Sequence, residues 1–396
     1  MSRIALLLSL ALLGAGPVRA QVEVSPLAAP DAFSTAGRET GLPAELWRGT
    51  PVEMARTVLP LLAGRPLSPA AATLARRVLA TGAPGPEGSR GDAGLTGARA
   101  NALIALGDPV AAGQILERAP GLDRSSDLSR AAAETALLGR DAPRACAIAA
   151  GLSIGRGEIY WLRLRAFCQA ETGQAAQAQL TFELAQTQAR DAVYGRLMGA
   201  KLSGAPPGAA SLRNGLDLAL SSALNLDLAA AKAAPAVAAA RAGADPTAPV
   251  YDVTVIDRDI GGLGASLVDG LPPPAAVSAL IAAAGEADAK TRTRLQGAAL
   301  LLAALSDDLP GTDRARIAGF SVADGKTPLG RSLAMEAATA QRRMGEAALL
   351  ALWISADAGA AGPALGDRVR IIRALAAVGL VGEARLFALE GLSALK

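Results

Sequence analysis

The chain has 396 residues, a formal net charge of +3, no histidine and only two cysteines. The lack of histidine excludes Ser-His-Asp and Cys-His catalysis and histidine-ligated zinc or haem sites. Basic residues are scattered and aromatic residues make up only 3%. Neither a nucleic-acid footprint nor a base-stacking platform is therefore predicted. Alanine and leucine dominate, and because alanine is the strongest helix former we expect an all-α fold.

The first 20 residues have the pattern of a secretory signal peptide. Arg3 precedes the apolar run 4–13, and a Gly/Pro break then leads to a small-residue cleavage site at Ala20. The run is too short to span a bilayer, which needs about 20 residues. A buried N-terminal helix is the alternative. We expect an exported, periplasmic protein with no membrane span after cleavage. Lipoprotein processing is not expected, because the residue directly after Ala20 is not a cysteine.

The two cysteines, Cys146 and Cys168, lie 22 residues apart. In an oxidising compartment such a pair tends to form a structural disulfide. The spacing is too wide for CxxC redox chemistry, and no histidine is present to complete a zinc site. Two separate buried thiols are the alternative, since free cysteine is often a small core residue.

The segment before the repeats divides into a leader and a helical hairpin. Residues 21–51 are rich in proline and alanine, and we expect Trp47 in this leader to pack onto the first helices. Helical periodicity predicts helices over 52–62 and 69–79. The Gly/Pro-rich stretch 81–94 predicts a loop, so that 52–94 forms an N-terminal hairpin with its exit loop.

Small residues recur at steps of 32 to 34 residues between residues 95 and 189. They are an alanine in each first helix, a glycine in each turn and an alanine in each second helix: Ala100, Ala133 and Ala166; Gly107, Gly139 and Gly173; Ala112, Ala145 and Ala178. Small side chains at these places let two antiparallel helices approach closely. The pattern resembles a degenerate tetratricopeptide repeat, whose period is about 34 residues. A plain helical bundle is the alternative.

The resemblance implies a right-handed α-solenoid of antiparallel helix pairs, either continuous or in two halves. The repeats would cover 95–243, with irregular helices after residue 212. It places Cys146 in the second helix of one unit and Cys168 in the first helix of the next, so a disulfide would join neighbouring repeats.

The C-terminal part begins with a change in amino-acid composition. Residues 244–274 are Gly/Pro-rich and open with a β-like alternation at Val253 and Val255. We expect a long loop or a linker between two solenoid halves. Helical repeats are expected again over 275–396, where two Gly-Glu-Ala turns, at Gly345 and Gly382, lie 37 residues apart.

Three short motifs are interpreted as non-functional. The sequence GGLGAS (261–266) lacks the third glycine and the strand of a dinucleotide loop. DRDIGG (257–262) offers Asp257 and Asp259 to a calcium ion, but Val268 occupies the place of the bidentate glutamate. SALK (393–396) is a Ser-Lys pattern at the end of the sequence. We expect no cofactor and no metal.

The resemblance also implies a binding surface. In tetratricopeptide-like stacks the first helices line a concave face that receives a peptide or a helix. Carried onto this sequence, that lining consists of eight residues: Asn101, Asp127, Arg130, Glu134, Tyr160, Arg163, Phe167 and Glu171. Of the family's carboxylate-clamping residues only Asn101 matches, and Gly97 replaces a basic one, so a free C-terminus is not the expected ligand.

The sequence therefore predicts a non-catalytic scaffold or docking protein that binds an envelope protein or peptide. One alternative is a structural, self-associating component of an envelope assembly. Another is a wall-glycan enzyme with a carboxylate pair, because a glycosidase needs only two carboxyl groups at a suitable distance.

Overall fold

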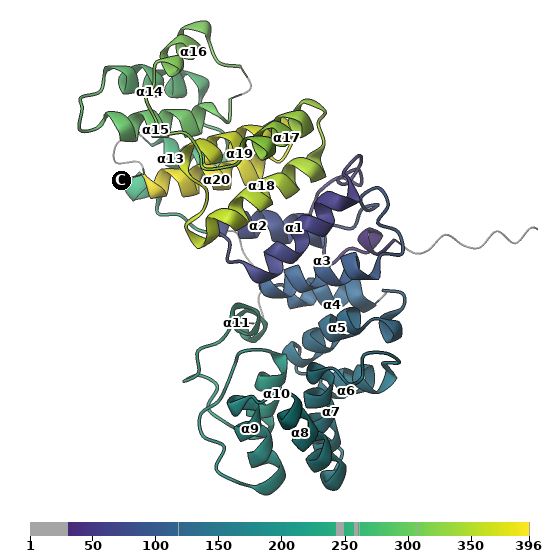
Figure 1. Cartoon of the computed structure of the whole chain (residues 1–396). Helices are drawn as coiled ribbons and strands as arrows, with labels where there is room; N and C mark the ends of the chain where they lie inside the picture. Colours follow the sequence, from purple (N-terminus) through teal and green to yellow (C-terminus); the bar gives the residue numbers. More distant parts are fainter. Residues whose placement is uncertain are drawn as a thin grey trace, which may run out of the picture.

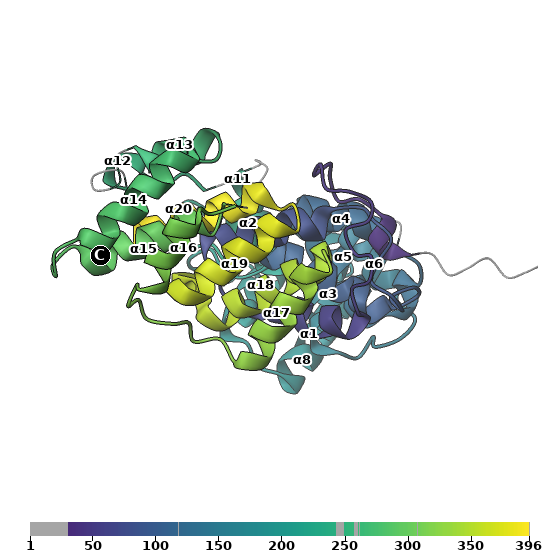
Figure 2. The same ribbon diagram turned by 90° about the horizontal axis from the view of Figure 1, so that it is seen from above.

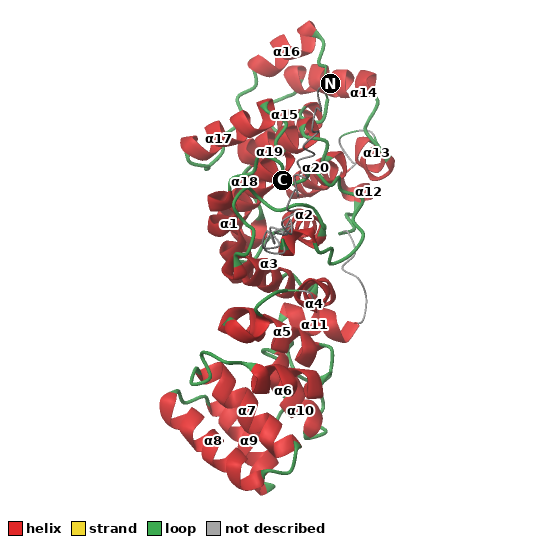
Figure 3. Ribbon diagram, turned by 90° about the vertical axis from the view of Figure 1, so that its right-hand side faces the viewer, coloured by secondary structure: helices red, strands yellow, loops and turns green. Residues whose placement is uncertain are grey.

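The computed structural model describes residues 31–117, 119–242, 249–256, 260, 262–306 and 308–395. This part of the chain forms 20 α-helices and no β-strand (Figures 1 and 3). The all-α expectation is confirmed. Within the same residues, no helix combines the length and apolar character needed to cross a bilayer. The predicted signal peptide (1–20) lies outside the described residues, as do Asp257 and Asp259 of the calcium-like motif.

The leader and the first helix pair form as expected. A short 3-10 helix, η1 (Ala32–Ser34), precedes α1 (Val52–Gly64) and α2 (Pro69–Ala80). Trp47 is buried in the same hydrophobic cluster as both helices, and its ring meets the Phe33 ring edge-on at 5.5 Å. The neighbouring Leu46 carbonyl accepts a hydrogen bond from the Gly345 N–H. The leader therefore also contacts the C-terminal part.

A buried arginine fixes the leader onto α2 and the following helix. The Arg99 guanidinium is fully buried and stacks 4.9 Å from the centre of the Phe33 ring. It donates hydrogen bonds to four backbone carbonyls, those of Ala32, Thr35, Leu79 and Thr81. Burial lowers the pKa of Arg99 to about 9. Because the carbonyls replace the lost water, this cation can be accommodated in the core.

Three helix pairs follow in sequence. They are α3 (Ala93–Ala105) with α4 (Pro109–Glu117), α5 (Ser126–Leu138) with α6 (Ala142–Gly151), and α7 (Ile159–Glu171) with α8 (Ala175–Gln188). A 3-10 turn, η2 (Leu122–Arg124), precedes α5. All six alanines of the 33-residue pattern are fully buried. As small side chains at helix contacts, they allow the close approach that the pattern predicts.

The turns inside the pairs differ in one respect from the prediction. Gly107 and Gly173 have left-handed backbone conformations, with φ of +82° and +76°. In the middle pair Gly139 is the C-cap at φ −76°, and the next residue, Arg140, takes the left-handed conformation instead. In this pair the left-handed residue is therefore the one after the glycine of the pattern.

The chain then turns back along the array. Helices α9 (Ala192–Ser203), α10 (Gly215–Ala223) and α11 (Pro235–Ala242) lie beside the column of α3–α8 (Figure 1). Helix α10 packs on α5, and α11 packs on α3, α4 and α5. Gly215 permits the first of these contacts, because a Cβ there would lie 2.8 Å from the Leu137 Cβ.

The remaining described residues form nine α-helices, with η4 (Gly359–Ala361) after α18. They are α12 (Val253–Ile256), α13 (Leu263–Asp269), α14 (Pro274–Glu286), α15 (Arg292–Ala303), α16 (Gly311–Ala318), α17 (Leu329–Ala340), α18 (Met344–Ala358), α19 (Leu365–Ala377) and α20 (Val381–Ala394). Helices α12 and α13 pack beside α20 (Figure 2).

The described residues of 244–274 include α12 and α13, so they do not form one long loop, and a linker between two solenoid halves stays a prediction. The β-like alternation at Val253 and Val255 lies in α12. The Asp252 side chain accepts hydrogen bonds from the N–H groups of Thr254 and Val255. This capping favours a helical turn over a strand.

The Gly-Glu-Ala sequences do not form turns either. Gly345 and Gly382 lie in the first turns of α18 and α20, whereas the left-handed turn residues are Arg342 and Gly379. Each precedes its glycine by three residues, so the 37-residue step is preserved.

The spatial order of the helices differs from their order in the chain. Helix α1 packs on α3 and on α18, and α2 packs on α18 and on α20. The first helix pair therefore lies between the array α3–α8 and the C-terminal helices (Figures 1 and 3). One hydrophobic cluster extends across this junction, from Phe33 to Leu392.

Candidate functional site

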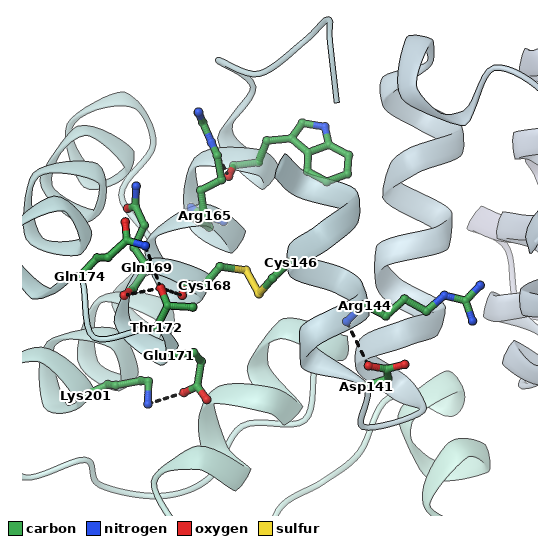
Figure 4. The surroundings of a disulfide bond; sticks show 12 residues. Asp141, Arg144, Cys146, Arg165, Cys168, Gln169, Glu171, Thr172, Gln174 and Lys201 are labelled. Atoms are coloured by element: carbon green, nitrogen blue, oxygen red, sulfur yellow. Dashed lines mark hydrogen bonds and ion pairs between the residues drawn. A yellow bond between two sulfur atoms is a disulfide. The ribbon is translucent and has the colours of Figure 1, made fainter. Parts of the chain in front are cut away.

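Cys146 in α6 and Cys168 in α7 form a disulfide (Figure 4). Their Cα atoms are 5.5 Å apart, inside the range that a disulfide can bridge. The predicted pairing is confirmed, and it joins the second helix of one pair to the first helix of the next. The disulfide therefore fixes α7, which carries four of the eight predicted binding residues.

Six of these eight residues line one cleft of about 490 Å³. The cleft lies among α3, α5, α7, α9 and α10, with Ala63 of α1 at its edge. The six are Asn101, Asp127, Arg130, Glu134, Tyr160 and Arg163. Residues from three successive helix pairs thus meet at one place.

The other two predicted residues lie elsewhere. Phe167 and Glu171 line a second pocket, of about 610 Å³. On α5, α7 and α10 the first cleft uses residues nearer the start of each helix, whereas the second pocket uses later residues and the loop after α10. The two openings therefore lie at opposite ends of this group of helices.

The eight predicted residues do not line one continuous groove in the described part of the chain. Helix α10 packs on α5 between the two openings, with Leu216 and Leu220 buried in the same cluster as Leu137 and Phe167. The cause is that the chain turns back after α9. This places the apolar helix α10 on the surface of α5 that would otherwise be open. Phe167 is 1% exposed, so it forms the wall of a pocket and is no free contact residue.

The sequence analysis missed four charged or aromatic residues that line the cleft: Asp191, Tyr194, Arg213 and Asp217. They come from the returning helices α9 and α10 and the loop between them. Only short-range sequence patterns could have pointed to these residues. Asp191 and Asn214 are N-cap residues, and Arg213 and Asp217 have the i, i+4 spacing of an ion pair.

An arginine bridges two carboxylates at one wall of the cleft. Arg213 donates from Nη2 to Asp191 Oδ2 at 3.0 Å and from Nε to Asp217 Oδ2 at 2.5 Å. The hydrogen bonds that Arg213 donates to Asp217 and to Asp191 raise the pKa of Arg213 despite its partial burial. Burial raises the pKa of Asp191, but hydrogen bonds from the Tyr194 N–H and Arg213 outweigh it and leave this pKa below its usual range.

Arg163 ties the same wall to α7. Its guanidinium donates to the Ala189 carbonyl at 2.9 Å, lies 3.5 Å from Asp191 Oδ2 and stacks over the Tyr194 ring. The Tyr194 hydroxyl in turn donates to the Arg163 carbonyl. The Arg163 Nε is buried and has no hydrogen-bond partner among the described residues.

The cleft is also lined by Glu134, a carboxyl group whose burial disfavours its charged form. Glu134 Oε2 accepts the Gly215 N–H at 2.8 Å. Burial nevertheless raises the pKa of Glu134, which indicates that its hydrogen bonds do not replace the lost water. The Tyr160 hydroxyl is buried beside Glu134 but makes no hydrogen bond of regular geometry within the described structure. Arg130 stacks 4.9 Å from the centre of the Tyr160 ring.

The rim of the cleft carries polar groups without internal partners. Asp127 and Arg130 are exposed, and Asn101 is half-buried. Across the described residues, Asn101 and Asp127 make no side-chain hydrogen bond or ion pair, and Arg130 makes only its stacking contact. In one wall of the cleft the charges of Arg213, Asp191 and Asp217 are paired, whereas the rim carries an acidic, a basic and an amide side chain. Apolar side chains such as Ile104 and Leu216 also line the cleft.

The described residues contain no group of three acidic or cysteine side chains placed to hold a metal ion. The cleft offers hydrogen bonding and charge to a ligand, with Tyr160 as a rigid surface and the buried Tyr194 behind it. No family model matches this sequence, and neither a curated protein nor a solved structure was found to be similar to it.

Proposed function

We propose that this protein is an exported, non-catalytic docking protein that binds a short segment of a cell-envelope protein in the cleft. The observation that carries this proposal is the convergence of Asn101, Asp127 and Arg130 at one rim, all available to a partner. An amide and two opposite charges suit a polypeptide, whose backbone and side chains supply both donors and acceptors.

The segment is expected to be short. Because α10 covers the surface between the two openings, an extended chain could not run across the array. A volume of about 490 Å³ lies within the usual size of ligand pockets, about 300–1,000 Å³. The partner would therefore insert a turn or a few side chains, and the rest of its contact would lie on the rim.

We further infer that α3–α8 are three degenerate tetratricopeptide-like repeats in a right-handed solenoid. The burial of all six patterned alanines supports this, as does the left-handed turn in every pair. The packing of α4 on α5 and of α6 on α7 agrees with a serial stack of pairs.

Export rests on two independent supports. The pattern of residues 1–20 is that of a signal peptide, and the disulfide is of the kind that persists in an oxidising compartment. For a bacterial protein these together favour the periplasm.

The carboxylates of the cleft bear on the enzyme alternative. Glu134 has a raised pKa and Asp191 a lowered one, the contrast expected of an acid and a base. Both Asp191 oxygens, however, are engaged, Oδ1 by the Val193 and Tyr194 N–H groups and Oδ2 by Arg213. A structural role of this kind favours binding over glycan hydrolysis.

One feature favours self-association as a second function. Two exposed leucine pairs have i, i+4 spacing: Leu180 and Leu184 on α8, and Leu329 and Leu333 on α17. Their exposed fractions are 69%, 54%, 84% and 64%. Paired leucines on one helix face are a common form of helix–helix contact.

The test is site-specific photocrosslinking in the native periplasm. The photoreactive amino acid p-benzoylphenylalanine replaces Asp127 at the rim and, as a matched control, Gln177, an exposed residue of α8. We expect a discrete heterologous adduct from position 127 only, and its loss when Arg130→Glu is added. Arg130 is preferable to Phe167 for this purpose because Phe167 is buried and its replacement would disturb the fold.

The outcomes separate the candidate functions. The same adducts from both positions, or an adduct that survives Arg130→Glu, would contradict docking in the cleft. An adduct of twice the chain mass that is lost in Leu180→Ser/Leu184→Ser would support self-association. Release of muropeptides from purified wall, abolished by Glu134→Gln, would support the enzyme.

A further inference from the structure

A separate pocket lies on the other side of the first helix pair. It has a volume of about 220 Å³ and lies between the leader and α2. Its lining is almost entirely polar: Arg38, Glu39, Thr40, Thr73, Arg76 and Arg77. Three arginine residues therefore line a space large enough for one small anionic group.

Two of these three arginines have a carboxylate partner. Arg38 Nη2 lies 2.9 Å from Asp108 Oδ2, and Arg77 forms an ion pair with Glu383 of α20. Both carboxylates are almost completely buried, with 2% and 3% of their side-chain surface exposed. These pairs connect the leader and α2 to their neighbours, and they account for two of the three positive charges.

The third arginine, Arg76, is not neutralised in this way. It donates to the Leu106 carbonyl at 3.2 Å and to Thr73 Oγ1 at 3.1 Å. In the described part of the chain it forms no ion pair. Burial and the nearby Arg38 charge lower the pKa of Arg76, and only Asp108 acts in the opposite direction. A positive charge is therefore held in a partly buried place without a full counter-charge.

Glu39 is the one acidic side chain in the lining, and its carboxylate is turned onto its own backbone. Its Oε1 accepts hydrogen bonds from the N–H groups of Thr40 and Gly41, at 3.2 and 3.0 Å. The residue is exposed, so water screens its charge more effectively than that of a buried group. It therefore lowers the affinity of the pocket for an anion without excluding one.

We propose that this pocket binds a phosphate group, either inorganic phosphate or the phosphate of a phosphomonoester. Guanidinium groups match phosphate oxygens with paired N–H donors, and such charge-assisted hydrogen bonds are about twice as strong as neutral ones. Arg76 supplies the unmatched charge, and Arg38 and Arg77 supply further donors. The site is distinct from the cleft, shares no lining residue with it, and does not depend on the proposed docking function.

Isothermal titration calorimetry of the full mature chain with inorganic phosphate tests this, at constant ionic strength and with chloride as the reference anion. We expect saturable binding with one site, weakened at least tenfold by Arg76→Gln, because glutamine keeps a donor for the Leu106 carbonyl but removes the charge. Glu39→Gln, an exposed change, is expected to tighten binding. Glycerol 3-phosphate is the second ligand. Tighter binding than inorganic phosphate identifies a phosphomonoester, and equal or weaker binding identifies the free ion.

Equal phosphate affinity in wild type and Arg76→Gln would overturn the proposal, as would the absence of a saturable signal in the wild type. If Arg76→Gln does not fold, the decision rests on Glu39→Gln, and unchanged or weaker binding in that variant would also overturn it.

Discussion

Glu390, near the end of α20, accepts a hydrogen bond from the backbone N–H of Ala70, in the first turn of α2 and 320 residues earlier in the chain. The N–H groups of a first helical turn have no partner within the helix, and a carboxylate there is also favoured by the helix dipole. The other Glu390 oxygen lies 2.5 Å from Arg368 Nη1 in an ion pair that is almost completely buried. This carboxylate therefore joins the first helix pair to the C-terminal helices.

Glu390→Gln should destabilise the protein by about 3 kcal/mol, because it leaves the buried Arg368 guanidinium without its counter-charge. Urea unfolding at pH 7 measures the change. Glu336→Gln, on the exposed side of α17, serves as the control and should change stability by no more than about 0.5 kcal/mol. Equal, small effects of both changes would show that the ion pair does not stabilise the junction.

Loss of the disulfide should cost about 3 kcal/mol in the loop-entropy model, since the bond closes a loop with a sequence separation of 22 residues. Intact-mass measurement of the purified mature protein should show two hydrogens fewer than the reduced chain. Unfolding of Cys146→Ser/Cys168→Ser then gives the free-energy difference. Labelling of both cysteines by a thiol reagent without denaturant would contradict the bond.

Ala133→Leu and Ala166→Leu should each destabilise the protein by about 1–3 kcal/mol, because both alanines are fully buried at helix contacts and leave no room for a larger side chain. Thermal melting provides the measurement. Ala176→Leu, at an exposed position of α8, is the matched control. Melting temperatures of both buried variants equal to that of the control variant would argue against close helix approach.

The pH dependence of stability should reveal the state of Glu134. Its folded-state pKa is raised by burial, so the folded chain holds this proton more tightly than the unfolded chain. The wild type therefore loses this contribution as pH rises from the ordinary carboxyl range through the folded pKa. Glu134→Gln removes the effect, and its stability relative to wild type should increase between pH 4 and pH 7 in urea unfolding.

Asp191→Asn should show the opposite trend in the same experiment. The pKa of Asp191 is lowered by its hydrogen bonds and arginine partners, so its ionised form stabilises the fold above the usual carboxyl pKa. The deficit of Asp191→Asn should be largest near neutral pH and shrink as the pH falls through the folded pKa. Parallel stability curves for the two variants would contradict these opposite shifts.

The cleft was partly predictable from the sequence. Asp127, Arg130 and Glu134 share one face of a helix, and this follows from their spacing once the helix is recognised. The 33-residue step then relates this face to Asn101 and Tyr160. Arg213 could not be assigned to the same place, because it follows an irregular loop, and no periodicity tells where a chain goes after such a loop.

The sequence by itself determined the helical class, the first helix pair and the burial of the patterned alanines, and it favoured the pairing of Cys146 with Cys168. These depend on local propensity and short-range periodicity, which composition and spacing express directly. Only the tertiary structure decided that α10 covers the predicted groove and that α2 meets α20. Such contacts depend on which apolar faces remain unburied once the local elements have formed, and that choice is made by packing over the whole chain.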